Sequence, residues 1–318
     1  MRVIQGINAV LKAPFASSVV TIGNFDGVHL GHQALIRRLT ERAREKSLPA
    51  VVVTFEPHPL KVLYPGRRFY RIFDLEDQLV QLAKLGIDVL VIEPFSREFS
   101  QLPPERFLVE GIFKPFVPES LIVGYDFSFG ANREGSIDFL KGHAPQLGFN
   151  VEVVPPVKIN DVIVSSSRIR QAVEAGDIEL AGQLLGRRFK LRGVIERGAG
   201  RGRALGVPTA NLRTTAELIP ARGVYAGLVE VHGKLIPAAI NIGLNPTFVN
   251  DDCKTTIEAH LLDFSGDLYG ENLSIEFVVR LREEKKFASA SELVEQIKLD
   301  LNQCRGLVGS LLTDVRKS

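Results

Sequence analysis

Two histidines three residues apart, His29 and His32, are the first candidates for chemistry in this sequence. They stand in the stretch TIGNFDGVHLGH, residues 21–32, between an apolar run and a segment with helical periodicity. Imidazoles at this spacing could bind zinc, hold a phosphate, or be ordinary buried histidines. The stretch has no HExxH pattern and the other histidines show no ligand spacing, so the sequence disfavours zinc.

The surroundings of the two histidines favour phosphate binding. Val19–Ile22 predicts a strand and a helix is expected to begin near Gly31, so the loop lies at a helix N-terminus. Backbone N–H groups and the helix dipole favour anions there, and glycines allow a phosphate close to the backbone. The loop has no GxGxxG and the chain has no GxxxxGK[ST], so neither a dinucleotide fold nor a P-loop is indicated.

Three other stretches contain candidate chemistry. SSSRIR, residues 165–170, could be a helix N-cap cluster, and GRALGVPTAN covers residues 202–211. Because RGAGR precedes the latter, it could be an RGG-like nucleic-acid tail, an incidental GxGxG or a flexible glycine loop. Glu258 interrupts a strand pattern, which is typical of a solvated charge, and the imidazole of His260 on the same strand could accept a proton.

The elements that must position these residues differ between the two halves of the chain. In the first half, apolar β-branched runs predict parallel strands buried on both faces, with amphipathic helices between them. We therefore expect a doubly wound α/β domain that binds ligands beyond the carboxyl ends of its strands. The expected strands are Val19–Ile22, Val51–Phe55, Val89–Ile92, Leu121–Val123 and Val151–Val154, and the expected helices are Gln33–Lys46, Asp74–Lys84, Pro104–Phe113, Ile137–Leu147 and Ser167–Leu185.

The second half predicts clustered strands without intervening helices, as in an antiparallel barrel or sandwich. His232-Gly233 predicts a tight hairpin turn, and a long amphipathic helix is expected over Ser291–Leu312. We predict the boundary near Gly182–Gly186, giving domains 1–185 and 186–318. The expected strands are Phe189–Glu196, Val224–Val231, Ile236–Ile242, Thr255–Leu262 and Leu273–Val279.

Composition narrows the class of protein. The chain has 318 residues, 45% hydrophobic and 24% charged, which suits about two globular domains. A net charge of +2 gives no support to nucleic-acid or membrane binding, and no run of about 18 apolar residues predicts a membrane span. The start has no signal-peptide pattern and Cys253 and Cys304 form no CxxC motif, so we expect a cytoplasmic protein with reduced thiols.

The motifs together resemble a known family. GNFDGVHLGH resembles the HxGH signature of the α/β nucleotidyltransferases, and its longer form resembles the bifunctional riboflavin kinase/FAD synthetases of bacteria. SSSRIR is similar to the family's SSTxIR, with Ser167 in place of threonine, and GRALGVPTAN is similar to the riboflavin kinase motif GRxLGxPTAN. The resemblance extends from about residue 1 to residue 312 and implies a nucleotidyltransferase domain followed by a mainly antiparallel β-barrel with a C-terminal helix.

For the first domain, the resemblance implies transfer of AMP from ATP to FMN, with release of pyrophosphate. His29 and His32 would hold the transferring phosphate, and Ser166, Ser167 and Arg170 the pyrophosphate. Nucleotide-binding residues implied by the motif are Gly23, Phe25 and Gly31. The implied flavin-binding residues, in two loops that follow strands, are Phe55, Pro57, His58 and Asp126.

For the second domain, the resemblance implies phosphorylation of riboflavin by ATP. Glu258 would be the general base, and Thr209 and Asn211 would help to hold Mg²⁺, which enters with ATP. A glycine loop with Gly202, Arg203 and Gly206 would cover ATP, and Arg282 and Phe287 would border the flavin. Two other functions remain open, namely an enzyme with one decayed site and a flavin-binding protein without turnover.

Overall fold

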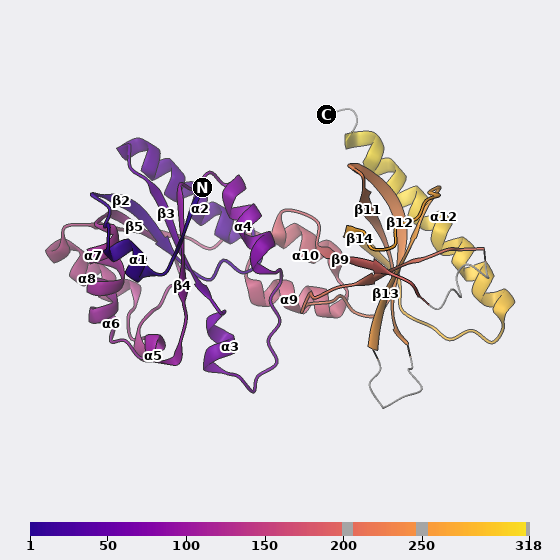
Figure 1. Ribbon diagram of the computed structural model, residues 1–318, viewed down its shortest axis with the longest axis horizontal. Helices are drawn as coiled ribbons and strands as arrows, with labels where there is room; N and C mark the ends of the chain where they lie inside the picture. Colours follow the sequence, from indigo (N-terminus) through magenta and orange to yellow (C-terminus); the bar gives the residue numbers. More distant parts are fainter. Residues whose placement is uncertain (199–205, 246–253, 316–318) are drawn as a thin grey trace. The chain divides into compact units, whose positions relative to one another are not determined.

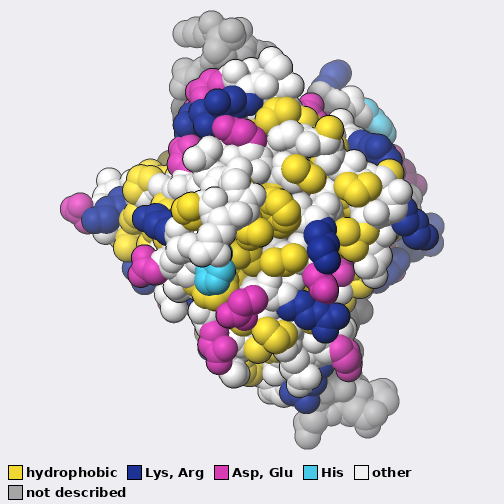
Figure 2. Space-filling view, turned by 90° about the vertical axis from the view of Figure 1, so that its left-hand side faces the viewer, with side chains coloured by type: hydrophobic (Ala, Val, Ile, Leu, Met, Phe, Trp, Pro, Cys, Tyr) yellow, Lys and Arg dark blue, Asp and Glu magenta, His cyan; other side chains and the backbone are white. Residues whose placement is uncertain are grey.

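The computed structural model describes residues 1–198, 206–245 and 254–315 (Figure 1). The chain forms two compact units, Met1–Ser166 and Ser167–Ser318. No helix in the described part of the chain is both long and apolar enough to cross a membrane. On the face in Figure 2, acidic and basic side chains are interspersed among hydrophobic ones, which agrees with the small net charge of +2.

The first unit contains a six-stranded parallel sheet in the order β1-β4-β3-β2-β5-β6. The five predicted strands are confirmed, whereas the sequence analysis missed β1, a short and mostly exposed edge strand without an apolar run. The strands are β1 (Arg2–Gln5), β2 (Ser18–Ile22), β3 (Ala50–Glu56), β4 (Val89–Pro94), β5 (Pro118–Gly124) and β6 (Asn150–Val154).

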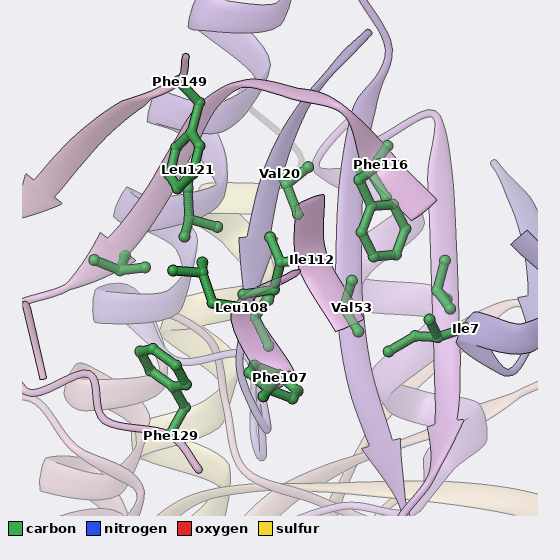
Figure 3. Packing of buried hydrophobic residues seen from close by; sticks show 14 of the residues in the cluster. Ile7, Val20, Val53, Phe107, Leu108, Ile112, Phe116, Leu121, Phe129 and Phe149 are labelled. Atoms are coloured by element: carbon green, nitrogen blue, oxygen red, sulfur yellow. The ribbon is translucent and has the colours of Figure 1, made fainter. Parts of the chain in front are cut away.

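Each face of this sheet packs against its own set of helices. Alternate side chains of a strand point to opposite faces, so Val20 lies in one core and Val19 in the other. The core drawn in Figure 3 joins the sheet to α1 (Ile7–Leu11), the π-helix η1 (Phe107–Phe113), α7 (Lys114–Phe116) and α8 (Ile137–Leu147). The other core joins it to α2 (Leu30–Lys46) and α4 (Leu75–Lys84).

Helix ends follow local chemistry. The Asp74 carboxylate caps α4 by accepting the N–H of Asp77 at 2.8 Å, as expected of an N-cap aspartate. The predicted helix Pro104–Phe113 instead consists of α6 (Pro104–Arg106) and η1. The wider π register lies just before Pro115, which has no N–H to donate to the preceding turn. The remaining short elements are α3 (Pro59–Leu63), α5 (Arg97–Ser100), η2 (Ala131–Arg133), β7 (Lys158–Ile159) and β8 (Val162–Ile163).

The second unit is a closed six-stranded barrel, not a sandwich, in the order β10-β13-β12-β11-β14-β9. The sequence analysis missed β10, because its sequence ANLR contains no apolar β-branched run. The predicted hairpin is confirmed, with positive φ angles of 48° at His232 and 77° at Gly233. The elements are β9 (Lys190–Glu196), β10 (Ala210–Arg213), β11 (Gly223–Val231), β12 (Lys234–Asn245), β13 (Lys254–Leu261), β14 (Asn272–Arg282) and α12 (Ala290–Val315).

Two helices precede the barrel where one was predicted. The expected helix Ser167–Leu185 was wrong in this respect, because the chain breaks between α9 (Ser166–Ala175) and α10 (Ile178–Leu185). Gly176 has a φ of +80°, and the Asp177 carboxylate then accepts the N–H of Leu180 at 3.0 Å to start α10. Since α10 packs on β14, it belongs to the same compact unit as the barrel.

Candidate active sites

The paired histidines lie at the N-terminus of α2, as predicted. His29 is the N-cap residue, and its Nδ1 accepts the backbone N–H of His32 at 3.2 Å. The two rings stack with centroids 3.6 Å apart, and the Phe25 ring contacts His32 edge-on at 5.2 Å. Because Nδ1 of His29 is an acceptor, the hydrogen of the neutral ring is on Nε2, so Nε2 is the donor of this ring.

Close packing shapes the loop that leads to these histidines. Phe25, Gly27 and Val28 all have positive φ angles of 49°, 81° and 40°. A Cβ on Gly27 would lie 2.9 Å from Cδ1 of Ile72, and a Cβ on Gly31 would lie 3.2 Å from the His29 ring. Gly23 ends the preceding strand by donating its N–H to the Val53 carbonyl at 3.0 Å. Gly27 and Gly31 therefore make room for neighbouring side chains, a role that the sequence did not indicate.

The structure brings part of the second motif to this loop. The Ser166 hydroxyl donates to the carbonyl oxygen of Asp26 at 2.9 Å, joining residues 140 positions apart. Ser167 is exposed and Arg170 half-buried, and both follow Ser166 in the first turns of α9. Their contact with phosphate stays a prediction.

The predicted flavin residues lie at the carboxyl ends of β3 and β5. Phe55 is half-buried at the end of β3, and Pro57 is exposed after a cis peptide bond with Glu56. His58 is buried, and its Nδ1 caps α3 by accepting the N–H of Leu60 at 3.2 Å. Asp126 is exposed after β5, where its charge and burial of the phenol raise the pKa of Tyr125, with burial the larger cause.

Phe55 packs with other aromatic side chains against the core of the first unit, and the sequence analysis had indicated only the part of this cluster in the loop 124–130. Phe95 lies 5.6 Å and Phe99 5.9 Å from Phe55, measured between ring centroids. Further along, Phe127 and Phe129 stack at 5.6 Å. Phe95 directly follows β4, so the rule that ligands bind at strand carboxyl ends could have singled it out.

The barrel groups three of its predicted site residues on one outer surface. Glu258 in β13 faces outward, because its neighbours Ile257 and Ala259 are buried inside the barrel. Asn211 in β10 is its direct cross-strand partner, and the Thr209 hydroxyl is 3.5 Å from Glu258 Oε2. Hydroxyl and amide oxygens are ligands suited to Mg²⁺, so Thr209 and Asn211 fit the metal that the sequence predicted.

The alternative base and a further polar neighbour flank Glu258. His260 shares its face of β13, but Nδ1 of His260 lies 2.7 Å from the Pro208 carbonyl. A carbonyl only accepts, so Nδ1 must carry the hydrogen and only Nε2 could act as a base. On the other side, Asn241 in β12 is the cross-strand partner of Glu258, a neighbour the sequence analysis did not select.

The remaining predicted residues are divided between described and undescribed parts of the chain. Arg282 pairs with the buried carboxylate of Asp300 in α12 at 2.8 Å, and its guanidinium lies 5.7 Å from the centroid of the Phe287 ring. Gly206 is an exposed turn residue with a φ of +78°. Gly202 and Arg203 lie outside the described residues, as does Cys253, whereas Cys304 is a buried free thiol.

The first unit is a parallel-sheet domain with histidines at a helix N-terminus, and the second is a barrel with a carboxylate beside a hydroxyl and an amide. These features are expected of enzymes that handle nucleotide phosphates. Comparisons with known proteins name the family. A family model described as FAD synthetase matches residues 12–168, and one described as riboflavin kinase matches residues 185–308. The chain belongs to the family of bifunctional riboflavin kinase/FMN adenylyltransferases.

Relatives match over the full length of the chain. The protein named bifunctional riboflavin kinase/FMN adenylyltransferase from Pseudomonas fluorescens is 38% identical over 96% of this chain and 98% of its own. Its namesake from Escherichia coli strain K12 is 37% identical over 97% and 98%. A crystal structure titled macrolide-efflux protein from Streptococcus pneumoniae is 34% identical, covers 96% of this chain and 99% of its own, and has a TM-score of 0.87.

Proposed function

We propose that the first unit adenylylates FMN around His29 and His32, and that the barrel phosphorylates riboflavin around Glu258. The observation that carries the first half is the hydrogen bond from Ser166 to the Asp26 carbonyl, which joins two distant motifs at a helix N-terminus. The second half is supported by the grouping of Thr209, Asn211 and Glu258 on one face of the barrel.

In adenylyl transfer, a phosphate oxygen of FMN attacks the α-phosphorus of ATP, and the bond from that phosphorus to the pyrophosphate breaks. The attacking oxygen is already anionic, so the protein need not supply a nucleophile. His29 donates from Nε2 to the transferring phosphate, beside the stacked ring of His32. Ser166, Ser167 and Arg170 stabilise the departing charge from the start of α9, and the rate gain comes from positioning and electrostatics.

In the kinase reaction, the 5′-hydroxyl of riboflavin attacks the γ-phosphorus of ATP, and ADP leaves. The carboxylate of Glu258 accepts the proton of the riboflavin hydroxyl. The side-chain hydroxyl of Thr209 lies next to this carboxylate. Thr209 and Asn211 would hold Mg²⁺, which when bound neutralises charge on the ATP phosphates. Arg282, which pairs with Asp300 in α12, and Phe287, whose ring lies beside the Arg282 guanidinium, border the flavin.

The functional division at residues 185 and 186 is part of this proposal. It is supported by the riboflavin kinase match, which begins at residue 185. The compact units divide earlier, after Ser166, so α9 and α10 fold with the barrel although α9 begins with the predicted pyrophosphate-binding serines. A buried free thiol at Cys304 is in keeping with a reducing compartment such as the cytoplasm.

The test is to supply the purified chain with Mg-ATP and either riboflavin or FMN, and to separate the flavins by chromatography. We expect FMN and then FAD from riboflavin, and FAD alone from FMN. FMN without FAD, or FAD only from supplied FMN, would mean that one site is inactive. Neither product, despite bound flavin, would favour the flavin-binding protein without turnover.

A further inference from the structure

We propose that Arg71 is a positioning residue for adenylyl transfer, because it ties the loop before His29 to the carboxyl end of β3. This inference rests on the proposed function of the first unit. Arg71 is buried, with only 8% of its surface exposed, and comes from the connection between α3 and α4. Its hydrogen bonds to Glu56 and Gln78 lead to the backbone of two loops, and we expect it to act through them.

The guanidinium of Arg71 donates hydrogen bonds to two different side chains. Nη1 donates to Glu56 Oε2 at 2.5 Å, and Nη2 donates to Gln78 Oε1 at 2.9 Å. Glu56 is the last residue of β3 and directly precedes Pro57 in the predicted flavin loop. Arg71 therefore anchors one wall of the predicted site directly.

Gln78 connects Arg71 to the loop that precedes His29. Its side chain in α4 is buried, and its Nε2 donates to the Asn24 carbonyl at 3.0 Å and to Thr54 Oγ1 at 3.3 Å. The Thr54 hydroxyl donates to the same Asn24 carbonyl at 3.2 Å. The amide of Gln78 thus holds the backbone one residue before Phe25 while its oxygen is held by Arg71.

The residue after Arg71 contacts the same loop. The N–H of Ile72 donates to Asp26 Oδ1 at 3.0 Å, and only 2% of the surface of Asp26 is exposed. The carbonyl of Asp26 in turn accepts the Ser166 hydroxyl. Residues 71 and 72 therefore hold the segment 24–26, whose left-handed Phe25 sets the course of the chain toward His29.

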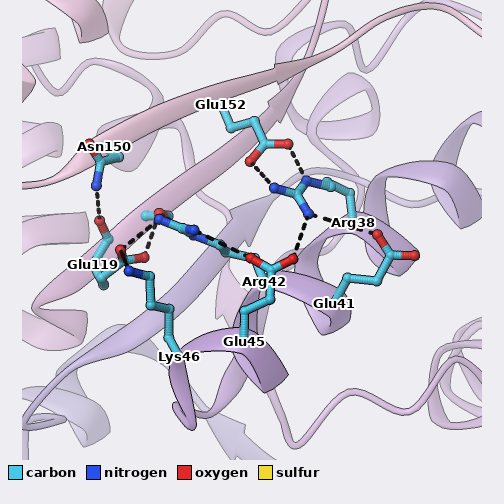
Figure 4. Close-up of polar contacts among 9 residues, drawn as sticks. Arg38, Glu41, Arg42, Glu45, Lys46, Glu119, Asn150 and Glu152 are labelled. Atoms are coloured by element: carbon cyan, nitrogen blue, oxygen red, sulfur yellow. Dashed lines mark hydrogen bonds and ion pairs between the residues drawn. The ribbon is translucent and has the colours of Figure 1, made fainter.

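A surface arginine in the same unit provides a matched control. Arg42 in α2 pairs with Glu119 at 2.8 Å and with Glu45 at 3.3 Å (Figure 4). Glu119 lies near the amino end of β5, which in a parallel sheet is the edge opposite to the histidine loop. Loss of the ion pairs of Arg42 should lower stability without displacing either of the two loops at the predicted adenylyltransferase site.

The experiment uses the full chain and measures kcat and KM for FAD formation from FMN and Mg-ATP. The variants are Arg71→Lys, Gln78→Met, the double substitution, and Arg42→Lys as control, with the kinase activity of each preparation reporting its integrity. Arg71→Lys keeps the charge but cannot donate to Glu56 and Gln78 from two guanidinium nitrogens, and Gln78→Met keeps the volume but loses the amide. Because a misplacement of about 1 Å can cost about 10²-fold in rate, we expect kcat to fall by about 10- to 100-fold with KM nearly unchanged.

The double variant separates positioning from simple destabilisation. If Arg71 acts on the loop through Gln78, the loss in kcat should be less than the product of the single losses. Arg42→Lys should retain the adenylyl-transfer kcat, and all variants should retain kinase activity. The inference is wrong if Arg71→Lys and Gln78→Met lower the melting temperature but leave kcat as in Arg42→Lys, or if their losses multiply. Absence of FAD formation by the wild-type chain would instead contradict the proposed function.

Discussion

Glu258 and His260 show how much a single residue's role depends on its hydrogen bonds. Both side chains lie on the outer face of β13, and both are of types that serve as general bases in enzymes. The ring of His260 is held at Nδ1 by a backbone carbonyl, whereas the carboxylate of Glu258 lies beside Thr209 and across from Asn211. Only the carboxylate is grouped with the predicted magnesium ligands, so we assign the proton transfer to it.

The substitution Glu258→Gln tests this assignment. Glutamine keeps the size and hydrogen-bonding capacity but accepts no proton, so kinase turnover should fall by about 10²- to 10⁴-fold. Riboflavin affinity and FAD formation from supplied FMN should be retained. Turnover of His260→Gln is measured in parallel, and a much larger loss in that variant would move the general base to the histidine.

His29 combines a helix cap with its predicted catalytic role, and the two can be separated. His29→Ala removes the cap of α2 and should cost about 1 kcal/mol of stability, whereas His29→Asn supplies another capping side chain. We expect His29→Asn to melt near the wild-type temperature and yet to lose FAD formation, while FMN still accumulates from riboflavin. A His29→Asn protein with full adenylyltransferase activity would reduce His29 to a structural cap.

At the scale of elements, β11 places an ionisable group inside the barrel. Tyr225 is fully buried, and its hydroxyl donates to the carbonyl of Ala221. Burial raises the pKa of Tyr225 from 10.0 to about 12, with a smaller opposing effect from Arg280. The folded barrel therefore holds this proton over a pH range in which the unfolded chain releases it.

This difference predicts a loss of stability in alkaline solution. Between pH 10 and about pH 12 the unfolded state binds fewer protons at this site than the folded state, so the contribution of Tyr225 falls as the pH rises. Urea unfolding of wild type and Tyr225→Phe at a series of pH values measures it. Across that range the free energy of unfolding of the wild type should fall relative to that of Tyr225→Phe. A difference between the two proteins that does not change with pH would contradict the assigned titration.

At the scale of the whole chain, the segment that precedes the barrel folds as part of the second unit. α10 buries four apolar side chains in the second unit, namely Ile178, Ala181, Leu184 and Leu185. Burial of a leucine or isoleucine side chain contributes about 1.5–3 kcal/mol, so a barrel without α10 loses a large part of a typical domain's stability. A fragment that begins after Leu185 therefore differs in stability from one that begins at Ser167.

We expect the fragment 167–318 to unfold cooperatively and to phosphorylate riboflavin without the first unit. The fragment 187–318 should melt at a clearly lower temperature, with kinase activity only where it remains folded. Thermal unfolding and kinase assays of both fragments make the comparison. A folded 167–318 fragment without kinase activity would mean that the kinase site requires residues of the first unit.

Local patterns in the sequence were sufficient for the main elements. The apolar runs from Val19 to Val154 predicted the central strands because strands buried on both faces must be continuously apolar. The motifs around His29 and Thr209 indicated the sites, since their glycines, imidazoles and hydroxyls are neighbours in the chain. Elements without such a pattern were missed or misread: the exposed β1, the four-residue β10, and the break at Gly176.

Tertiary structure decided which of these residues meet. The bond from Ser166 to Asp26, the links from Arg71 through Gln78 to Asn24, and the pairing of Asn211 with Glu258 all join distant parts of the chain. The sequence determined the residue types, the order of elements and the chemistry available to each motif. The partners of buried polar groups depend on the packing of whole elements, because each such group must find its hydrogen bond wherever the completed fold brings a partner.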